Sequence, residues 1–356
     1  MNLWGDHLGY EIRYLGRRDV VQCGVWDFKA AIKDVETSLN LQRLGHTVMP
    51  AELPLRWPNP AAAGWETDEQ VAEAGATEVA SDFGVFALPA FVGGAHPAAG
   101  LKWTAHRPTG IRTDLPHVMG LIVLNDGVSL CPTAVVESGL IGAARTAAVS
   151  ALAMDRLGWN DPSRVAVYGA GFLAEAHLRM LSQLFPGMEE VLLVNRTRER
   201  AERLKDKLAG IFPWEVTIVD FSHRAFEVSD VVITCTSSES PYVKKGWVHE
   251  GLLAIHIGLF EFSFEAIDTF DRIVVDKWGE FKNTSMKSLF RMYRKGRVSE
   301  RDIHAELDEI VAAGQIDMTG HSVFFNSFGL SIFDIALAAR IVRTAHHKGL
   351  GLELPL

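Results

Sequence analysis

Two glycines and an alanine, Gly169, Gly171 and Ala174, stand between a short apolar run and a stretch with helical spacing. A strand, tight turn and helix of this kind is typical of one half of a dinucleotide site. Gly169 permits the sharp turn, Gly171 leaves room for a pyrophosphate to touch the backbone, and Ala174 lets the helix lie close to the strand. The helix N-terminus offers free N–H groups and a positive dipole end to the phosphates. The residues predicted to bind the phosphates are Gly169, Ala170, Gly171, Phe172 and Leu173.

The pattern on both sides of the turn supports this interpretation. Residues 165–168 are a compact apolar strand, residues 176–184 have helical spacing, and residues 191–194 are a second apolar strand. The alternative is a glycine turn in some other α/β unit.

The end of that second strand indicates which dinucleotide binds. An NAD site usually has Asp or Glu there for the ribose 2′-hydroxyl, whereas Arg accommodates a 2′-phosphate. Here the position falls at Asn195 and Arg196, followed by Thr197 and Arg198. No carboxylate repels a phosphate and two guanidiniums can pair with it, so NADP is favoured over NAD. The alternative is that Arg198 and Arg200 are solvated charges at a helix start and NAD binds.

Two further apolar strands, residues 230–234 and 253–257, run out into hydroxyl residues and a glycine. Ligands of an open parallel sheet lie beyond the carboxyl ends of its strands. The residues expected to line the cofactor at these ends are Thr234, Thr236, Ser237 and Gly258.

A helix packed with small residues is predicted over residues 138–157, and Arg145 is the large cation in its middle. Small side chains permit close approach of neighbouring elements, so we expect this helix between two domains. A buried Arg is costly unless it is paired. Arg145 is therefore a candidate clamp for a substrate carboxylate, and the alternative is pairing with an internal Asp or Glu.

Length, charge and cysteine usage limit the class of protein. The chain has 356 residues and a formal net charge of -9, which allows two domains and offers no basic footprint for nucleic acid. No targeting core or membrane-spanning apolar run is apparent. Three scattered cysteines argue against a disulfide framework or zinc ribbon and suit a reducing, cytoplasmic compartment. His256 and His304 share no ligand spacing with other residues, so no metal site is predicted.

Outside the dinucleotide unit, the pattern predicts a second, α+β domain. An amphipathic helix begins at Phe28, and short strands with turn signals between residues 85 and 127 suggest a mixed sheet. Residues 280–318 have the pattern of charged helices, and the apolar run from Val323 is expected to start a C-terminal helix that returns to the first domain. The predicted division is an α/β Rossmann domain over residues 146–324 and a substrate-binding and dimerisation domain over residues 13–145 with 325–356.

Five segments, in order along nearly the whole chain, resemble the ornithine cyclodeaminase/mu-crystallin family. They are Gly100-Leu-Lys-Trp, Arg145-Thr-Ala-Ala, the Gly169 turn, Thr234-Cys-Thr-Ser-Ser, and Asn326-Ser-Phe-Gly with Asp334. Five segments resemble, within the family, the N-(2-amino-2-carboxyethyl)-L-glutamate dehydrogenases that make 2,3-diaminopropionate: Gly100-Leu-Lys-Trp, Val231-Val-Ile-Thr-Cys-Thr, Pro241-Tyr, Ile273-Val-Val-Asp-Lys-Trp and His304-Ala-Glu-Leu. The family implies a homodimer built by the first domain and an amino-acid substrate held in a cleft against a nicotinamide. It implies Lys102 and Arg145 as substrate-binding residues, and Arg56 lies where relatives also place a basic residue.

The resemblance also indicates the reaction. Cyclodeaminases carry a catalytic Asp after the strand equivalent to residues 255–259, whereas here Glu261 stands one position along, which argues against cyclodeamination. Arg145 and Arg56 can fix a carboxylate. Lys102 can take or give the proton if neighbouring cations and burial lower its pKa. Glu261 is the candidate for a second acid or base, or for the ligand of the substrate ammonium.

We therefore predict NAD(P)-dependent oxidation of N-(2-amino-2-carboxyethyl)-L-glutamate to an imine, which water splits into 2-oxoglutarate and L-2,3-diaminopropionate. The alternatives are an NADPH-dependent ketimine or imine reductase, another amino-acid dehydrogenase, an ornithine cyclodeaminase, and a non-catalytic nucleotide-dependent binding protein.

Overall fold

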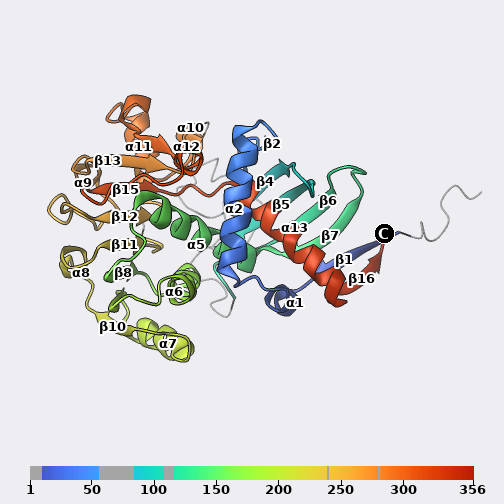
Figure 1. Cartoon of the computed structure of the whole chain (residues 1–356), viewed down its shortest axis with the longest axis horizontal. Coiled ribbons are helices and arrows are strands. Elements are labelled where there is room, and N and C mark those ends of the chain that lie inside the picture. Colours follow the sequence, from blue (N-terminus) through green and yellow to red (C-terminus); the bar gives the residue numbers. More distant parts are fainter. Residues whose placement is uncertain (1–9, 56–83, 108–114, 239, 280) are drawn as a thin grey trace, which may run out of the picture.

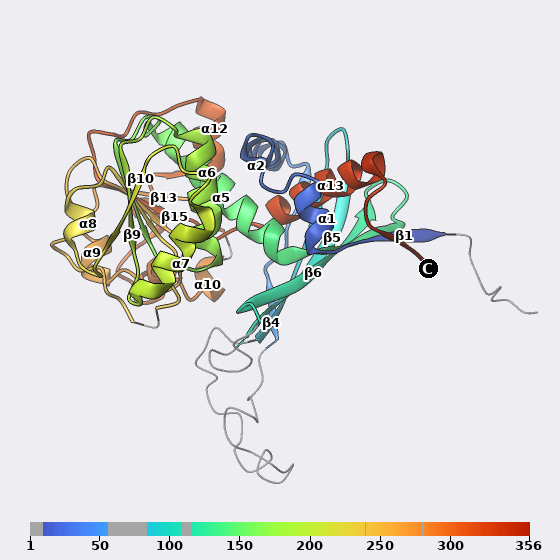
Figure 2. The same cartoon turned by 90° about the horizontal axis from the view of Figure 1, so that it is seen from below.

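The computed structural model describes residues 10–55, 84–107, 115–238, 240–279 and 281–356. Within these residues the chain is an α/β protein, as predicted, and it has two eight-stranded sheets. The parallel sheet lies in the left half of Figure 1 and the mixed sheet in the right half, with α2 (Phe28–Arg43) and α5 (Ser138–Leu157) between them. The turned view in Figure 2 shows the same arrangement.

The parallel sheet has the strand order β10-β9-β8-β11-β12-β15-β13-β14. Its strands are β8 (Arg164–Tyr168), β9 (Glu190–Val194), β10 (Glu215–Val219), β11 (Val231–Thr234), β12 (Leu253–His256), β13 (Arg272–Val275), β14 (Ala305–Glu306) and β15 (Val323–Asn326). The central strands are continuous apolar runs because helices cover both faces. The chain winds from β8 outward to β10 and returns to β11 on the other side of β8. Ligands bind at such a switch point, beyond the carboxyl ends of the strands.

Helices of different length connect these strands. They are α6 (Phe172–Leu184), α7 (Arg198–Leu208), α8 (Arg224–Glu227), α9 (Phe264–Ile267), α10 (Phe281–Thr284), α11 (Ser288–Arg294) and α12 (Leu307–Ala313). The two longest, α6 and α7, follow β8 and β9, so the predicted strand, turn, helix and strand are all present.

The mixed sheet has the order β16-β1-β7-β6-β5-β4-β2, with β3 also paired to β4. Its strands are β1 (Glu11–Leu15), β2 (Thr47–Val48), β3 (Leu53–Leu55), β4 (Gly84–Val92), β5 (Ala98–His106), β6 (Val118–Asp126), β7 (Pro132–Glu137) and β16 (Leu352–Pro355). The C-terminal helix α13 (Ser331–Lys348) packs across β4, β5 and β6, as predicted for its return to this part of the chain. Lys102 and Ile122 pair across β5 and β6 and are buried, whereas the adjacent pair of Trp103 and Leu121 is exposed.

The helix α5 joins the two sheets, since it follows β7 directly and precedes β8. Glu137 caps its N-terminus by accepting hydrogen bonds from the backbone N–H groups of Gly139 and Leu140, and Gly158 ends it in the left-handed conformation with φ of 106°. Its small residues let it pack against both α2 and α6. Within the described part of the chain, no helix is both long enough and apolar enough to cross a bilayer.

Two expectations for the second half of the chain were wrong. The run from Val323 does not start the C-terminal helix: it forms β15, between β12 and β13, and α13 begins at Ser331. A short apolar run has the same pattern in a buried strand and a buried helix. Residues 280–318 include the short strand β14 as well as helices. The domain division stays a prediction; β1 begins at Glu11 and β15 ends at Asn326, each two residues outside the predicted limits.

Candidate cofactor and substrate site

The glycine turn follows β8 directly, and its backbone has the geometry that phosphates need. Gly169 has φ of 114°, and a Cβ atom at this position would lie 2.7 Å from the Cys235 carbonyl oxygen, so no larger residue fits. Gly171 is the N-cap of α6 and makes no side-chain cap. A Cβ atom at Gly171 would have no neighbour within 4 Å. The space beside Gly171 is therefore open, and the N–H groups of the first turn of a helix, here beginning with Phe172 and Leu173, have no partner within the helix, which fits a pyrophosphate.

The loop after β9 holds the residues predicted to select the cofactor. The backbone N–H of Gly169 donates to the carbonyl of Val194, the last residue of β9, so the loop starts beside the glycine turn. The Asn195 side chain donates to the Thr197 carbonyl at 2.7 Å, and Thr197 is the N-cap of α7. The Arg198 guanidinium, more than half exposed, pairs with Glu202 at 3.1 Å. No acid occupies residues 195–198, and the exposed guanidiniums suit a 2′-phosphate.

Glu261 joins the ends of β11 and β12. Its carboxylate accepts hydrogen bonds from the backbone N–H and the hydroxyl of Thr236, at 2.6 and 2.5 Å, and from the backbone N–H of Gly258 at 3.0 Å. The side chain is fully buried. Burial raises the pKa of Glu261, and the bonds from Thr236 oppose that rise. The predicted cofactor residues Thr236 and Gly258 are thus held by one carboxylate, while Thr234 is buried and Ser237 exposed beside them.

This placement differs from the expectation of Glu261 as an acid or base. A group that exchanges protons with a substrate must reach it within hydrogen-bond distance, directly or through one water. Both oxygens of Glu261 are occupied by the polypeptide itself. These hydrogen bonds show that the Glu261 carboxylate holds the loops after β11 and β12 together.

Lys102, Asp334 and Arg145 form a buried charge cluster built from β5, α13 and α5. The Lys102 ammonium donates to Oδ2 of Asp334 at 2.9 Å, and Nε of Arg145 donates to Oδ1 at 3.2 Å. Asp334 is fully buried, and the two cationic side chains are exposed by 9% and 12%. The structure therefore brings together the two predicted substrate residues and shows that an internal Asp pairs with Arg145. Arg56 lies outside the described residues.

The charges in this cluster shift one another's pKa. Burial raises the pKa of Asp334, but Arg145 and Lys102 outweigh it and hold the pKa below its usual range. Burial and the nearby Arg145 lower the pKa of Lys102, although Asp334 opposes them. Lys102 is the group here whose proton is most readily removed, because the Arg guanidinium stays charged. The cluster can hold a carboxylate and exchange a proton.

Two residues with no predicted role, Gly329 in the Asn326-Ser-Phe-Gly segment and Asp276, place Arg145 against the parallel sheet. Gly329 follows β15 with φ of 93°, and a Cβ atom there would clash with Nη1 of Arg145 and lie 3.0 Å from its Cζ. The Gly329 N–H donates to Asp276 at 2.6 Å, and Asp276 directly follows β13. Arg145 thus lies at the carboxyl edge of β13 and β15. Neighbouring strands are about 4.8 Å apart, so β15 lies three spacings, or roughly 14 Å, from β8 and the glycine turn.

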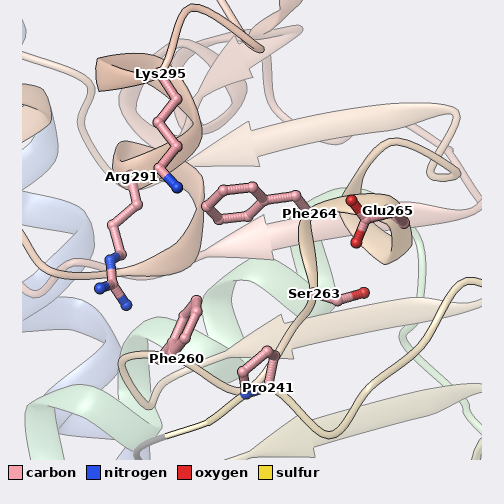
Figure 3. A pocket seen from close by; sticks show the side chains of 7 residues that line it. All are labelled: Pro241, Phe260, Ser263, Phe264, Glu265, Arg291 and Lys295. Atoms are coloured by element: carbon pink, nitrogen blue, oxygen red, sulfur yellow. The ribbon is translucent and has the colours of Figure 1, made fainter.

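A cavity of about 200 Å³ lies between the loop after β12 and α11. In Figure 3, Arg291 on α11 and Lys295 at its C-terminal end extend toward the rings of Phe260 and Phe264. The Arg291 guanidinium lies 4.2 Å from the Phe260 ring centroid, and the Lys295 ammonium lies 5.3 Å from that of Phe264. The lining contains none of the predicted site residues.

Comparison with known proteins gives the chain relatives over most of its length. It is 28% identical to the N-((2S)-2-amino-2-carboxyethyl)-L-glutamate dehydrogenase of Staphylococcus aureus over 280 residues, which cover 76% of this chain and 82% of that one. It is 27% identical to the ketimine reductase mu-crystallin of Rattus norvegicus over 235 residues, covering 66% and 72%. An archaeal alanine dehydrogenase dimer with bound NAD superposes with a TM-score of 0.80 at 24% identity, covering 98% of this chain and 100% of that one.

The model of the ornithine cyclodeaminase/mu-crystallin family matches residues 31–349. This range includes the glycine turn and all three members of the buried charge cluster. The resemblance read from the five sequence segments is confirmed. The chain belongs to the ornithine cyclodeaminase/mu-crystallin family.

Proposed function

We propose that the protein is an NAD(P)-dependent oxidoreductase that acts on the C–N bond of an amino acid. Its proposed substrate is N-(2-amino-2-carboxyethyl)-L-glutamate, and its products are 2-oxoglutarate and L-2,3-diaminopropionate. The observation that carries the proposal is the buried cluster of Lys102, Asp334 and Arg145 at the carboxyl edge of a parallel sheet with a dinucleotide turn. The name of the Staphylococcus aureus relative supports the choice of substrate.

The chemistry divides between the cofactor and the cluster. NAD(P), when bound, accepts the hydride that leaves the α-carbon of the glutamate portion. The terminal nitrogens of Arg145 fix the carboxylate on that carbon, which points its C–H bond in one direction. Lys102 in its neutral form takes the proton from the secondary nitrogen, so that a C=N bond replaces the C–H and N–H bonds. Water then adds to this carbon, and the C–N bond breaks to give the ketone and the primary amine.

Asp334 is proposed to orient both cations without exchanging a proton. Its pKa stays low, so it remains charged while Lys102 titrates. The bond to Nε leaves the forked end of Arg145 for the substrate. Glu261 is proposed as a loop-holding residue, because both of its oxygens bind backbone N–H groups.

The proposed cofactor is NADP rather than NAD. Asn195 and Arg196 at the end of β9 support this choice, since a 2′-phosphate needs cations and the absence of an acid there. Fluorescence titration with both reduced cofactors tests it. Tighter binding of NADPH is expected, and tighter binding of NADH would contradict it.

A second candidate is an NADPH-dependent ketimine or imine reductase, which runs the same hydride transfer in the opposite direction. The same loop at Asn195 and Arg196 favours it, and one relative is named a ketimine reductase. One assay distinguishes the dehydrogenase from the ketimine or imine reductase. Purified protein is given N-(2-amino-2-carboxyethyl)-L-glutamate with NAD or NADP, and separately a cyclic ketimine with NADPH, while the absorbance of reduced nicotinamide is followed.

We propose a homodimer formed by the outer face of the mixed sheet. Trp103, Leu121 and Val123 are 42%, 41% and 37% exposed on this face, and Trp103 and Leu121 are cross-strand partners. A contiguous apolar face on a sheet marks a contact surface. The similar alanine dehydrogenase is a dimer. Light scattering of the purified protein tests the state directly, and a monomer at micromolar concentration would contradict it.

We also propose a cytoplasmic location. The thiols of Cys23, Cys131 and Cys235 are all free, which suits a reducing compartment. Fractionation of cells that express the tagged protein tests this, and recovery from a secreted fraction would contradict it.

A further inference from the structure

Lys287 is a buried lysine that contacts the carboxyl end of β12. It is the N-cap of α11 and only 3% exposed. Its ammonium donates to three consecutive backbone carbonyls, those of His256 at 3.3 Å, Ile257 at 2.7 Å and Gly258 at 2.6 Å. Three N–H donors thus meet three acceptors in an environment with little water. Burying a charged ammonium costs free energy unless hydrogen bonds or an opposite charge compensate for the lost water. A lysine this deeply buried therefore suggests a role for its charge.

The held segment is the part of the chain that follows β12 into the proposed redox site. The Gly258 carbonyl accepts a hydrogen bond from Lys287, and the Gly258 N–H donates to Glu261. Glu261 also accepts a hydrogen bond from the N–H of Thr236, which follows β11. The next residue of the helix, Ser288, donates its N–H to the Leu259 carbonyl. Lys287 therefore fixes one side of a loop whose other side sets the position of Thr236.

Four charged or titratable groups surround Lys287. They are His256 on β12, Glu261 in the following loop, Asp276 after β13 and Arg145 on α5. Burial lowers the pKa of Lys287 to about 8, with a smaller contribution from Arg145, while Glu261 and Asp276 raise it. His256 is also fully buried and its pKa is lowered by burial, so it stays neutral near pH 8.

We propose that Lys287 is a positioning residue of the redox site: its protonated ammonium holds residues 256–258 in place, and loss of that proton weakens this hold. The rate measurements that test this inference rest on the proposed function. The hydrogen-exchange measurement rests only on the hydrogen bonds of Lys287. A neutral amine has two N–H donors for the three carbonyls, so the loop loses one bond. Deprotonation follows the pKa of Lys287, so the effect appears as the pH rises past about 8.

The test compares Lys287→Met, Lys287→Arg and the matched control Lys295→Met; Lys295 is the exposed C-cap of the same helix whose N-cap is Lys287. Folding of each variant is checked by thermal denaturation and dinucleotide binding. Lys287→Met is expected to lower kcat about 10- to 100-fold, the loss associated with misplacing reacting groups by up to 1 Å. Lys287→Arg keeps a charge over the whole range, so the fall of kcat near pH 8 is expected to move to higher pH. Lys295→Met is expected to match the wild type.

Hydrogen exchange at one fixed pH gives a readout that needs no substrate. The peptide covering residues 256–262 is expected to exchange faster in Lys287→Met than in the wild type and in Lys295→Met. If the wild type oxidises no amino acid, the proposed function fails while this readout still tests the inference. The inference is overturned if Lys287→Met keeps wild-type exchange in this peptide, or if Lys287→Arg keeps the wild-type fall near pH 8. Should Lys287→Met not fold, the pH profiles of the wild type and Lys287→Arg decide.

Discussion

Replacing Gly329 by Ala tests the position of Arg145 with the addition of one methyl group. The new Cβ atom would clash with Nη1 of Arg145 and lie 3.0 Å from Cζ, closer than the 3.4 Å at which ordinary contacts begin. The backbone φ of 93° at Gly329 is already strained for Ala, so the backbone cannot relieve the clash and the guanidinium must move by about 1 Å. A misplacement of that size lowers rates about 100-fold, which corresponds to about 2.7 kcal/mol of transition-state stabilisation. We expect kcat/KM to fall by this factor.

The matched control is Gly142→Ala on α5. A Cβ atom there would meet only Asp334, at an ordinary distance of 3.8 Å, and Ala favours a helix over Gly. Its kcat/KM is expected to stay near the wild-type value. The strain of Ala at positive φ costs about 1–3 kcal/mol, against a typical total stability of about 5–15 kcal/mol, so Gly329→Ala should fold and bind dinucleotide normally. Wild-type kcat/KM in Gly329→Ala would refute the assignment of Arg145.

Three further predictions concern the proton, the cofactor and the dimer. Lys102 must be neutral to accept a proton, so oxidation should speed up as the pH rises through the lowered pKa of Lys102. Asp334→Asn removes a negative charge that raises this pKa. The rising limb of the pH profile of kcat/KM should therefore move to lower pH in Asp334→Asn. A limb that stays in place in Asp334→Asn argues against Lys102 as the base. Arg196→Ser should weaken NADPH binding about 10-fold in fluorescence titration, because one charge-assisted hydrogen bond contributes about 1.5 kcal/mol. NADH binding should stay unchanged. Equal effects on both cofactors would rule out recognition of the 2′-phosphate by Arg196. Leu121→Asp should give a monomer in light scattering because it buries a charge in the proposed interface, and a persistent dimer would move the interface elsewhere.

The dinucleotide turn was predictable because its signals are local. Gly169, Gly171 and the flanking apolar runs lie within a few residues of one another, and each serves a backbone geometry that few residues permit. The helix α5 was predictable for a similar reason, since its small residues and its cap lie within one continuous segment.

The charge cluster was predictable only in part. Lys102 was identified through a resemblance, and Arg145 also as the large cation in a helix of small residues, but the bonds that join them to Asp334 span 232 and 189 residues. Local spacing carries no information about such a contact. Lys287 lies in a stretch read as charged helices, and its burial depends on how α11 meets the loop after β12.

The error at β15 has a physical origin. Its four residues, Val323–Asn326, are buried on both sides, so no alternation of polar and apolar residues marks them as a strand. The apolar stretch then continues into α13 after the break at Gly329. Helix and strand therefore share one hydrophobic run, and only the pairing with β12 and β13 separates them.

The proposed function requires an amino-acid substrate to lie between the buried charge cluster and a nicotinamide. Deuterium transfer tests it most directly, with N-(2-amino-2-carboxyethyl)-L-glutamate deuterated at the α-carbon of its glutamate portion. After incubation of the wild type with this substrate and NAD(P), mass spectrometry should find the deuterium in the reduced nicotinamide, with little transfer by Lys102→Met. Release of the deuterium to water, or no reduced nicotinamide from a protein that binds both molecules, would contradict this placement of the substrate.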